Sequence, residues 1–294
     1  MFPIAQWQRH LAFTFRKITM KKNQSLSLSA LFLAAIAAPL SSAQAAQVTL
    51  SFSNLSAANG AALTPIFLAL HNGSFDAFDV GGTASSAIKA VAELGDVSGL
   101  VSMFAASSAA MAGGISTTVT ASVNGFGPGV FLPGASGSVT LNLDPMKNRY
   151  LSYFSMVVPS NDRFIGNDAP TEIELFDAQG NFTGGTYVEN GSSIWDAGTE
   201  LDGAPGAAFA VGSNALDNPA QNGTIQANYD FTAYPGLPTP AGYNFTNFPG
   251  ANTPLLQISA VSQVPLPGAV WLFGSALPLF GWMRRRSLTS NLSA

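Results

Sequence analysis

Acidic residues are confined to the middle of this chain of 294 residues. All 16 acidic residues lie within residues 46–263, where only four basic residues accompany them, so that this segment has a formal charge of −12. Five basic residues and no acid precede residue 46, and three basic residues and no acid follow residue 263. The chain therefore divides into one acidic segment, long enough for a well-buried core, between two apolar ends with basic residues.

This distribution excludes several classes of function. A domain of this charge repels phosphate backbones, so we expect no nucleic-acid partner. The chain has no Cys, which rules out disulfide bridges and Cys-ligated metal sites. The same acidity suits divalent cations.

The first 45 residues have the features of an upstream extension followed by a signal peptide. Lys21 and Lys22 follow Met20, which is an alternative start to Met1. An apolar run covers residues 31–40, and Ala43-Gln44-Ala45 has the small-residue pattern of a cleavage site. We therefore expect an exported protein.

The C-terminal end predicts a single membrane span. Val264–Met283 is 20 residues without a charge, about 30 Å as a helix, which matches a hydrocarbon core. Arg284, Arg285 and Arg286 follow at once and mark the cytoplasmic side. The acidic domain is then expected on the far side of that membrane, with residues 287–294 as a short tail.

The whole segment 264–286 resembles a PEP-CTERM sorting signal. Val264-Pro265-Leu266-Pro267 stands where that signal has its short motif, and the apolar span and the three arginines follow in order. Leu266 replaces the Glu of the motif's name. The resemblance implies a bacterial protein whose tail is processed by an exosortase, and an association with the cell envelope or extracellular polysaccharide.

Residues 46–263 read as short strands separated by Gly, Pro, Asn and Ser. Residues 48–54 alternate between apolar and polar side chains, which indicates a strand with one buried face. The continuous apolar run at 66–70 indicates a strand buried on both faces. Further strands are expected at 115–123, 137–143, 150–158, 172–176 and 255–261.

Helical periodicity is limited to one part of the domain. Residues 84–94 predict a helix that ends at Gly95, and a second helix is expected at 98–112. Gly203–Gly250 reads as a long irregular loop. The fold class expected is all-β: an antiparallel β-sandwich with one or two short helical insertions, in addition to the signal peptide and the C-terminal transmembrane helix.

The sequence offers little for catalysis. His71 is the only histidine of the acidic domain, and its place at a strand end is typical of a structural residue. Glu172 and Glu174 share one face of a strand and are the candidates for a carboxylate-dependent hydrolase. Such a pair is more often the solvated side of an edge strand, so we expect no enzyme.

Two loops gather the candidate metal ligands. Asp162 lies in the loop at 158–166, and Asp196 and Glu200 flank a turn that contains Gly198. Hard cations such as Ca²⁺ need several oxygen ligands, and carboxylates contribute most strongly. If the two loops lie at one end of the sandwich, these three side chains can bind one ion.

Four stretches resemble the spondin N-terminal domain family: residues 67–85, 94–100, 159–162 and 195–200. The resemblance implies a calcium-bound β-sandwich whose loop acids fall on Asp162, Asp196 and Glu200. It also implies extracellular-matrix or adhesion roles. The chain departs from the animal members in lacking cysteines, and its loop 203–250 has no clear counterpart.

Three functions follow as hypotheses. The first is a non-catalytic calcium-binding adhesion module displayed at the cell envelope or outside the cell, with a surface protein or extracellular polysaccharide as partner. The second is an exopolysaccharide-binding module, in which aromatic side chains of the loop stack on sugar rings; these are Tyr229, Phe231, Tyr234, Tyr243 and Phe245. Packing within the loop is the alternative for these side chains, and we favour it. The third, a hydrolase, is the least favoured.

Overall fold

Two antiparallel sheets make up most of the computed structural model, which describes residues 45–121, 129–215 and 218–263. The first sheet has the strand order β5-β1-β12-β9. Its strands are β5 (Ser136–Leu143), β1 (Ala46–Asn54), β12 (Pro254–Gln263) and β9 (Thr186–Asn190). The strands from the two ends of the acidic domain, β1 and β12, therefore pair at the centre of one sheet.

The second sheet has the order β11-β10-β7-β6-β3-β4, with two short strands paired to β6. Its strands are β11 (Gln226–Ala227), β10 (Ile194–Asp196), β7 (Arg163–Gly166), β6 (Tyr150–Val158), β3 (Ile66–His71) and β4 (Ile115–Val119), together with β2 (Ala62–Leu63) and β8 (Ile173–Glu174). Every pairing between the described strands is antiparallel.

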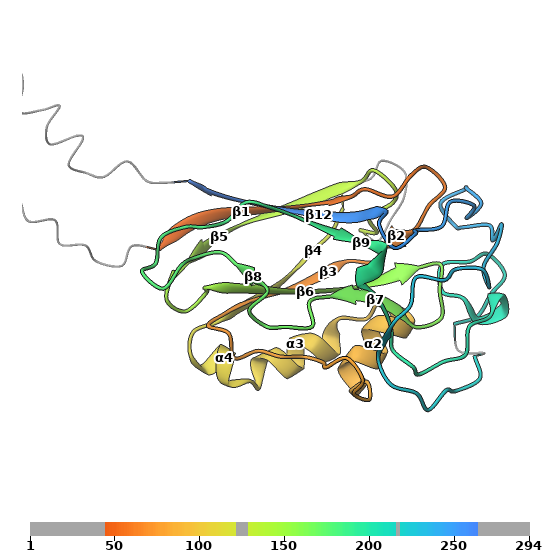
Figure 1. Ribbon diagram of the computed structural model, residues 1–294, viewed down its shortest axis with the longest axis horizontal. Coiled ribbons are helices and arrows are strands. Elements are labelled where there is room, and N and C mark those ends of the chain that lie inside the picture. The colour runs from red at the N-terminus through yellow and green to blue at the C-terminus, as the bar shows by residue number, and fades with distance from the viewer. Residues whose placement is uncertain (1–44, 122–128, 216–217, 264–294) are drawn as a thin grey trace, which may run out of the picture. The chain divides into compact units, whose positions relative to one another are not determined.

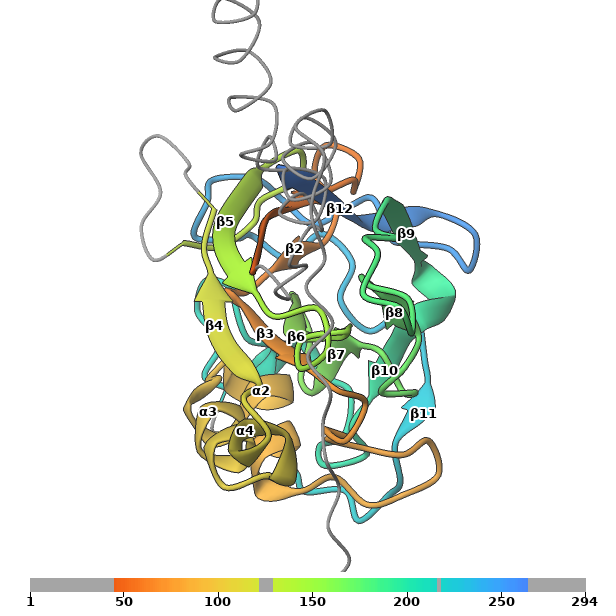
Figure 2. The same cartoon turned by 90° about the vertical axis from the view of Figure 1, so that its left-hand side faces the viewer.

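The two sheets face each other across an apolar core (Figures 1 and 2). Phe52 of β1 and Ile258 of β12 meet Leu68 of β3 and Tyr153 of β6 in this core, and all four are fully buried. The period of two in β1 places its apolar residues inward, because successive side chains of a strand point to opposite faces. The alternation predicted at 48–54 is thus confirmed.

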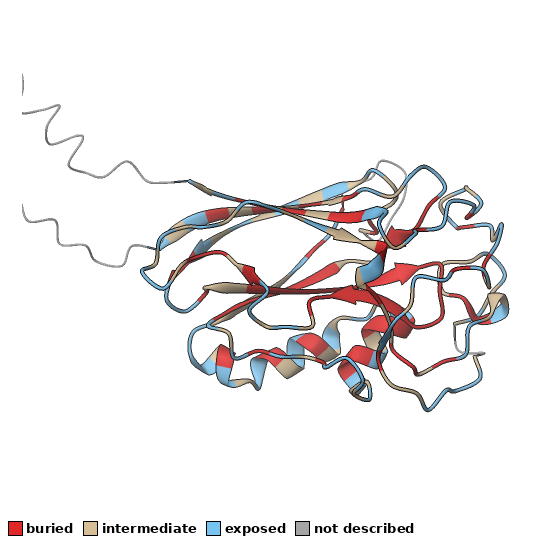
Figure 3. Cartoon of the chain, viewed as in Figure 1, coloured by how far each residue is buried: buried red, intermediate tan, exposed pale blue. Residues whose placement is uncertain are grey.

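Three helices cover the opposite face of the second sheet (Figures 1 and 3). They are α2 (Ser86–Leu94), α3 (Ser98–Ala105) and α4 (Ser108–Met111). Because helices lie on one side of β3 and the first sheet on the other, all six residues of β3 are buried. This confirms the strand predicted to be buried on both faces.

The helix boundaries follow local capping. Ser85 accepts a hydrogen bond from the Ile88 amide, and Gly95 ends α2 with a φ of 66°, a left-handed conformation that favours glycine. The second predicted helix is divided, since Ser107 has an extended backbone and caps α4 separately. The expectation of mostly antiparallel β-structure with few helices is confirmed, although the helices form a layer of their own.

Two segments expected to be loops form strands instead. β7 and β10 pair with each other, and their register places Asp196 opposite Arg163. Each is too short for its alternation to be visible in the sequence. The described residues of 203–250, which are 203–215 and 218–250, are irregular as expected, apart from β11 and a 3-10 turn at Ala204–Gly206. A further 3-10 turn, Gly191–Ser193, precedes β10.

The predicted signal peptide and the predicted C-terminal span lie outside the described residues. Within those residues, no helix has the length and apolar character needed to cross a membrane.

Candidate metal centre

Asp162 lies between β6 and β7 and is fully buried. Its Oδ2 accepts hydrogen bonds from the backbone amides of Thr199 at 2.7 Å and Glu200 at 3.0 Å, and from the Thr199 hydroxyl at 3.1 Å. Its Oδ1 is buried and has no hydrogen-bond partner among the described residues. Burial raises the pKa of Asp162 to about 6, and the nearby Asp196 carboxylate adds to this.

Asp196 ends β10, and a tight turn holds its carboxylate in place. Oδ1 accepts from the amide of Gly198 at 2.8 Å, and Oδ2 accepts from Asn228 Nδ2 at 2.9 Å. Gly198 has a φ of 66°, and a Cβ there would lie 2.7 Å from the Thr224 amide nitrogen. Glycine is therefore required by both the conformation and the space at this turn.

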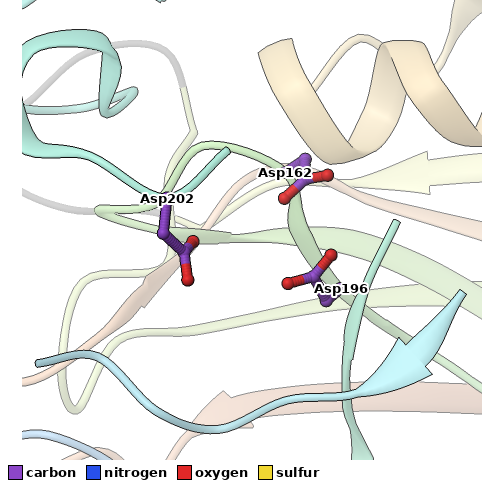
Figure 4. A group of neighbouring side chains, drawn as sticks. All are labelled: Asp162, Asp196 and Asp202. Carbon is purple, nitrogen blue, oxygen red and sulfur yellow. The ribbon is translucent and has the colours of Figure 1, made fainter. Parts of the chain in front are cut away.

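The third carboxylate that joins these two is Asp202. Asp162, Asp196 and Asp202 each place one carboxylate oxygen within 4.8 Å of the others. Figure 4 shows the three side chains arriving from separate segments around a common space. Asp162 is buried, Asp196 is half-buried and Asp202 is exposed, so the cluster opens to solvent on the side of Asp202.

Glu200 was expected here, and the structure gives it a different place. Its backbone amide supports Asp162, while its carboxylate accepts a hydrogen bond from Asn218 Nδ2. Burial raises the pKa of Glu200 to about 7, so it is a weaker anion near neutral pH than an ordinary glutamate. Glu200 and Asp202 lie in one irregular segment, and nothing in their spacing predicts which of the two carboxylates faces Asp162.

Arg163 adds a buried positive charge beside the cluster. Its side chain is fully buried, and its Nη2 donates to Asp202 Oδ2 at 2.6 Å. Three carboxylates and one guanidinium leave a formal charge of −2. A divalent cation would neutralise that charge, whereas a buried charge without a partner is costly.

The donor set fits a hard divalent cation. Calcium binds oxygen ligands at about 2.3–2.6 Å, so two ligands of one ion lie up to about 5 Å apart. The 4.8 Å limit on the three oxygens fits within that span. The buried Asp162 Oδ1, to which no described residue donates a hydrogen bond, is the atom that such an ion would satisfy. The three clustered aspartates therefore fit a calcium ion.

A polar pocket of 440 Å³ lies beside the cluster. Asp196 belongs to both the cluster and the pocket. The remaining lining residues are small or carry amide and hydroxyl groups, and none is positively charged; they are Gln221, Gly223, Thr224, Gln226, Ala227 and Asn228.

The other candidates from the sequence have structural partners. His71 is fully buried, its Nε2 lies 3.0 Å from Ser152 Oγ, and its Nδ1 accepts from the amide of Gly73. Burial lowers the pKa of His71 to about 4, so the ring is neutral at physiological pH. Glu174 forms an ion pair with Arg149. Burial, followed by the charges of Glu189 and Asp168, raises the pKa of Glu172.

The aromatic residues proposed for sugar stacking are mostly internal. Phe231, Tyr234 and Phe245 are at most 1% exposed, and Tyr243 donates its hydroxyl proton to the Gly60 carbonyl. Tyr229 is 43% exposed. The hypothesis of a joint stacking surface therefore fails for the three buried rings, because they pack against one another and against the sheets.

Fold and site together define a two-sheet antiparallel protein with a helical layer and an aspartate cluster at one end of its second sheet. The Spondin_N family model matches residues 56–227, which is more than half of the chain. The protein belongs to the Spondin_N family. No curated protein matches this chain. The matched range includes the three aspartates and ends at Ala227, before the segment that contains Phe231 and Tyr234.

Proposed function

We propose that this protein is a non-catalytic, calcium-binding module that is exported and acts at the cell envelope or in the extracellular matrix. The observation that carries the proposal is the fully buried Asp162, whose neighbours Asp196 and Asp202 reach the same space. Its Oδ1 has no hydrogen-bond partner in the part of the chain that the structure describes. When bound, calcium neutralises these carboxylates and holds three segments together. The chain's own residues provide the ligands and the supporting amides.

Export and sorting are supported by the sequence of the two ends. The basic, apolar and small-residue regions before residue 46 favour a signal peptide. The segment 264–286 favours a PEP-CTERM signal in a bacterial protein, with an exosortase as processing partner and a transient hold in the inner membrane. Mass spectrometry of the mature protein tests this: the proposal expects N-terminal cleavage after Ala45 and loss of the C-terminal tail.

The metal assignment is tested by calorimetric titration of the full chain with calcium. Asp162→Asn, Asp196→Asn and Asp202→Asn should each weaken calcium binding by roughly tenfold or more, because calcium affinity depends on the number of charged ligands. Glu200→Gln tests whether the third ligand is Asp202, which the distances between the carboxylates favour, or Glu200, which the family resemblance implies. If Glu200→Gln weakens binding as much as Asp162→Asn while Asp202→Asn does not, Glu200 is the third ligand.

A second function is favoured by the polar pocket beside Asp196. A pocket lined by amides and hydroxyls suits the hydroxyl groups of a neutral saccharide, since both can donate and accept hydrogen bonds. An anionic ligand is disfavoured, because the lining carries no positive charge. The test is NMR titration with neutral hexasaccharides and a uronic-acid hexasaccharide. Shifts at Gln226 and Asn228 with the neutral sugars alone support this function, and no shift with any of them rejects it.

A further inference from the structure

The segment Asn228–Tyr234 is attached to two of the three clustered carboxylates. At its beginning, Asn228 Nδ2 donates to Asp196 Oδ2 at 2.9 Å. At its end, the Tyr234 hydroxyl lies 2.5 Å from two acceptors, Asp202 Oδ1 and Asn161 Oδ1. Burial, followed by the hydrogen bond to Asp202, raises the pKa of Tyr234 far above its ordinary value, so the hydroxyl keeps its proton. The two ends of the segment thus depend on where Asp196 and Asp202 lie.

Arg163 makes a third connection between the segment and the cluster. Nη2 bonds Asp202, and Nη1 donates to the backbone carbonyl of Asp230 in the middle of the segment. The guanidinium carbon lies 4.5 Å from the centroid of the Phe231 ring and 5.6 Å from that of Tyr234. Such stacking is favourable for a desolvated guanidinium. Arg163 therefore joins the third carboxylate to the backbone and rings of the segment.

The backbone of the segment has little regular pairing of its own. β11 ends at Ala227, and the amides of Asp230 and Thr232 bond to side chains within the segment. The packing of Phe231 against Phe245 anchors its middle, while the hydrogen bonds to Asp196, Asp202 and Arg163 fix its path. Residues 226–228 also form one wall of the polar pocket.

We propose that cation binding at the aspartate cluster orders the segment Asn228–Tyr234 and, with it, the adjoining wall of the polar pocket. This inference rests on the proposed calcium site. Without a cation, the neighbouring charges of Asp162 and Asp196 repel each other. The carboxylates that hold the segment, those of Asp196 and Asp202, then separate more readily. With a cation they are held together, so an opening of the segment that disrupts the cluster must also release the ion. Coupling of this kind is reciprocal, so a ligand that fixes the pocket wall strengthens cation binding.

Hydrogen exchange on the full chain tests the coupling, with calorimetry on the same sample as an independent measure of calcium binding. The reporters are the amides of Asn228 and Tyr234, which bond to the carbonyls of Ile194 and Phe231. The reference amides are those of Thr239 and Gly242, in a turn of the same long loop. At free calcium about ten times the dissociation constant, exchange at the reporters should slow roughly tenfold. Exchange at the reference turn should change less than about twofold, because its local opening does not release the ion.

Two matched variants separate the coupling from general stabilisation. Tyr234→Phe keeps the buried ring and all three carboxylates but removes the hydroxyl's hydrogen bonds to Asp202 and Asn161. It should still bind calcium, with a smaller slowing of exchange at Asn228 than in the unaltered protein. Tyr243→Phe removes a hydroxyl that bonds the Gly60 carbonyl, away from the cluster, and should retain the full slowing.

The outcomes distinguish the inference from the proposed function. If calorimetry shows calcium binding while exchange of Asn228 and Tyr234 is unchanged, the coupling is wrong and the calcium site stands. The coupling is also wrong if Tyr234→Phe and Tyr243→Phe show the same full slowing. If calcium produces neither heat nor slowing, the calcium site and the coupling both fail.

Discussion

The space between the two sheets and the end of the molecule that carries the aspartate cluster are held together by different chemistry. Between the sheets, apolar side chains such as Phe52, Leu68 and Ile258 are fully buried against one another. At the cluster, fully buried Asp162 and Arg163 are surrounded by amides, a phenol and carboxylates. The first region needs no partner, whereas the second has a net negative charge that a cation would neutralise.

This difference predicts different responses to the same perturbations. Apolar burial depends little on pH or calcium, because it comes from the removal of apolar area from water. A cluster of buried carboxylates depends on both, because protons and cations compete for the same oxygens. Three perturbations test whether the stabilities of the two regions respond independently to pH and calcium.

The largest loss of stability is expected in the sheet core. Phe52→Ala removes a fully buried ring from β1 and should lower the free energy of unfolding by about 3–5 kcal/mol. Urea denaturation with and without calcium measures it. The loss should be equal in the two conditions; a loss that depends on calcium would show that the sheet core and the cluster are not independent.

A smaller effect is expected from pH on the calcium-free protein. The pKa of Asp162 is about 6 in the folded state against 3.8 ordinarily, so the folded protein binds this proton more tightly than the unfolded chain. The contribution of the protonated Asp162 to stability is present below about pH 4 and is lost as the pH rises through 6. Across that window the stability difference between the unaltered protein and Asp162→Asn should change by about 2–3 kcal/mol.

Denaturation in a chelator at pH 4 and pH 7.5, on both proteins, measures this difference. Subtracting the variant removes the contributions of the titrating groups that do not interact with Asp162. With saturating calcium the trend should reverse, because the ion stabilises the ionised carboxylate. A difference between the two proteins that does not depend on pH would mean that the Asp162 carboxyl is not perturbed.

The smallest effect is expected at the helical layer. Gly95→Ala places a Cβ at a φ of 66° and 2.6 Å from Thr64 Cγ2, so the end of α2 must shift. The free energy of unfolding should fall by about 1–2 kcal/mol. Thermal unfolding in calcium and in a chelator checks this, and the two conditions should agree, since α2 supplies no carboxylate to the aspartate cluster. A larger loss in calcium than in the chelator would instead link this cap to the metal centre.

The fold was predictable where a strand or helix is long enough to show its period. The alternation of β1, the apolar run of β3 and the cap of α2 at Gly95 all identified their elements. β7 and β10 were missed because four and three residues carry no readable period, and their pairing depends on partners far along the chain.

The site was predictable in part for the same reason. Asp162 directly precedes β7, and Asp196 is the last residue of β10. Because β7 and β10 are paired, both carboxylates lie near one end of the sheet. The choice between Glu200 and Asp202 depends on the side-chain directions in an irregular segment. Arg163 and Tyr234 contact each other beside the cluster although they lie 71 positions apart in the chain, so no local sequence pattern predicts their part in the site.

The most direct test of the account is the melting temperature of the full chain with and without calcium. At a calcium concentration about one hundred times the dissociation constant, binding stabilises the folded protein by about 2.7 kcal/mol, a rise of roughly 5–10 °C for a domain of this size. Asp162→Asn, whose calcium binding is expected to be roughly tenfold weaker or more, should show about half of this rise or less. Asp177→Asn, in an exposed turn after β8 where asparagine can accept the same backbone hydrogen bonds, should retain it. No rise in the unaltered protein, or an equal rise in Asp162→Asn, would contradict the account.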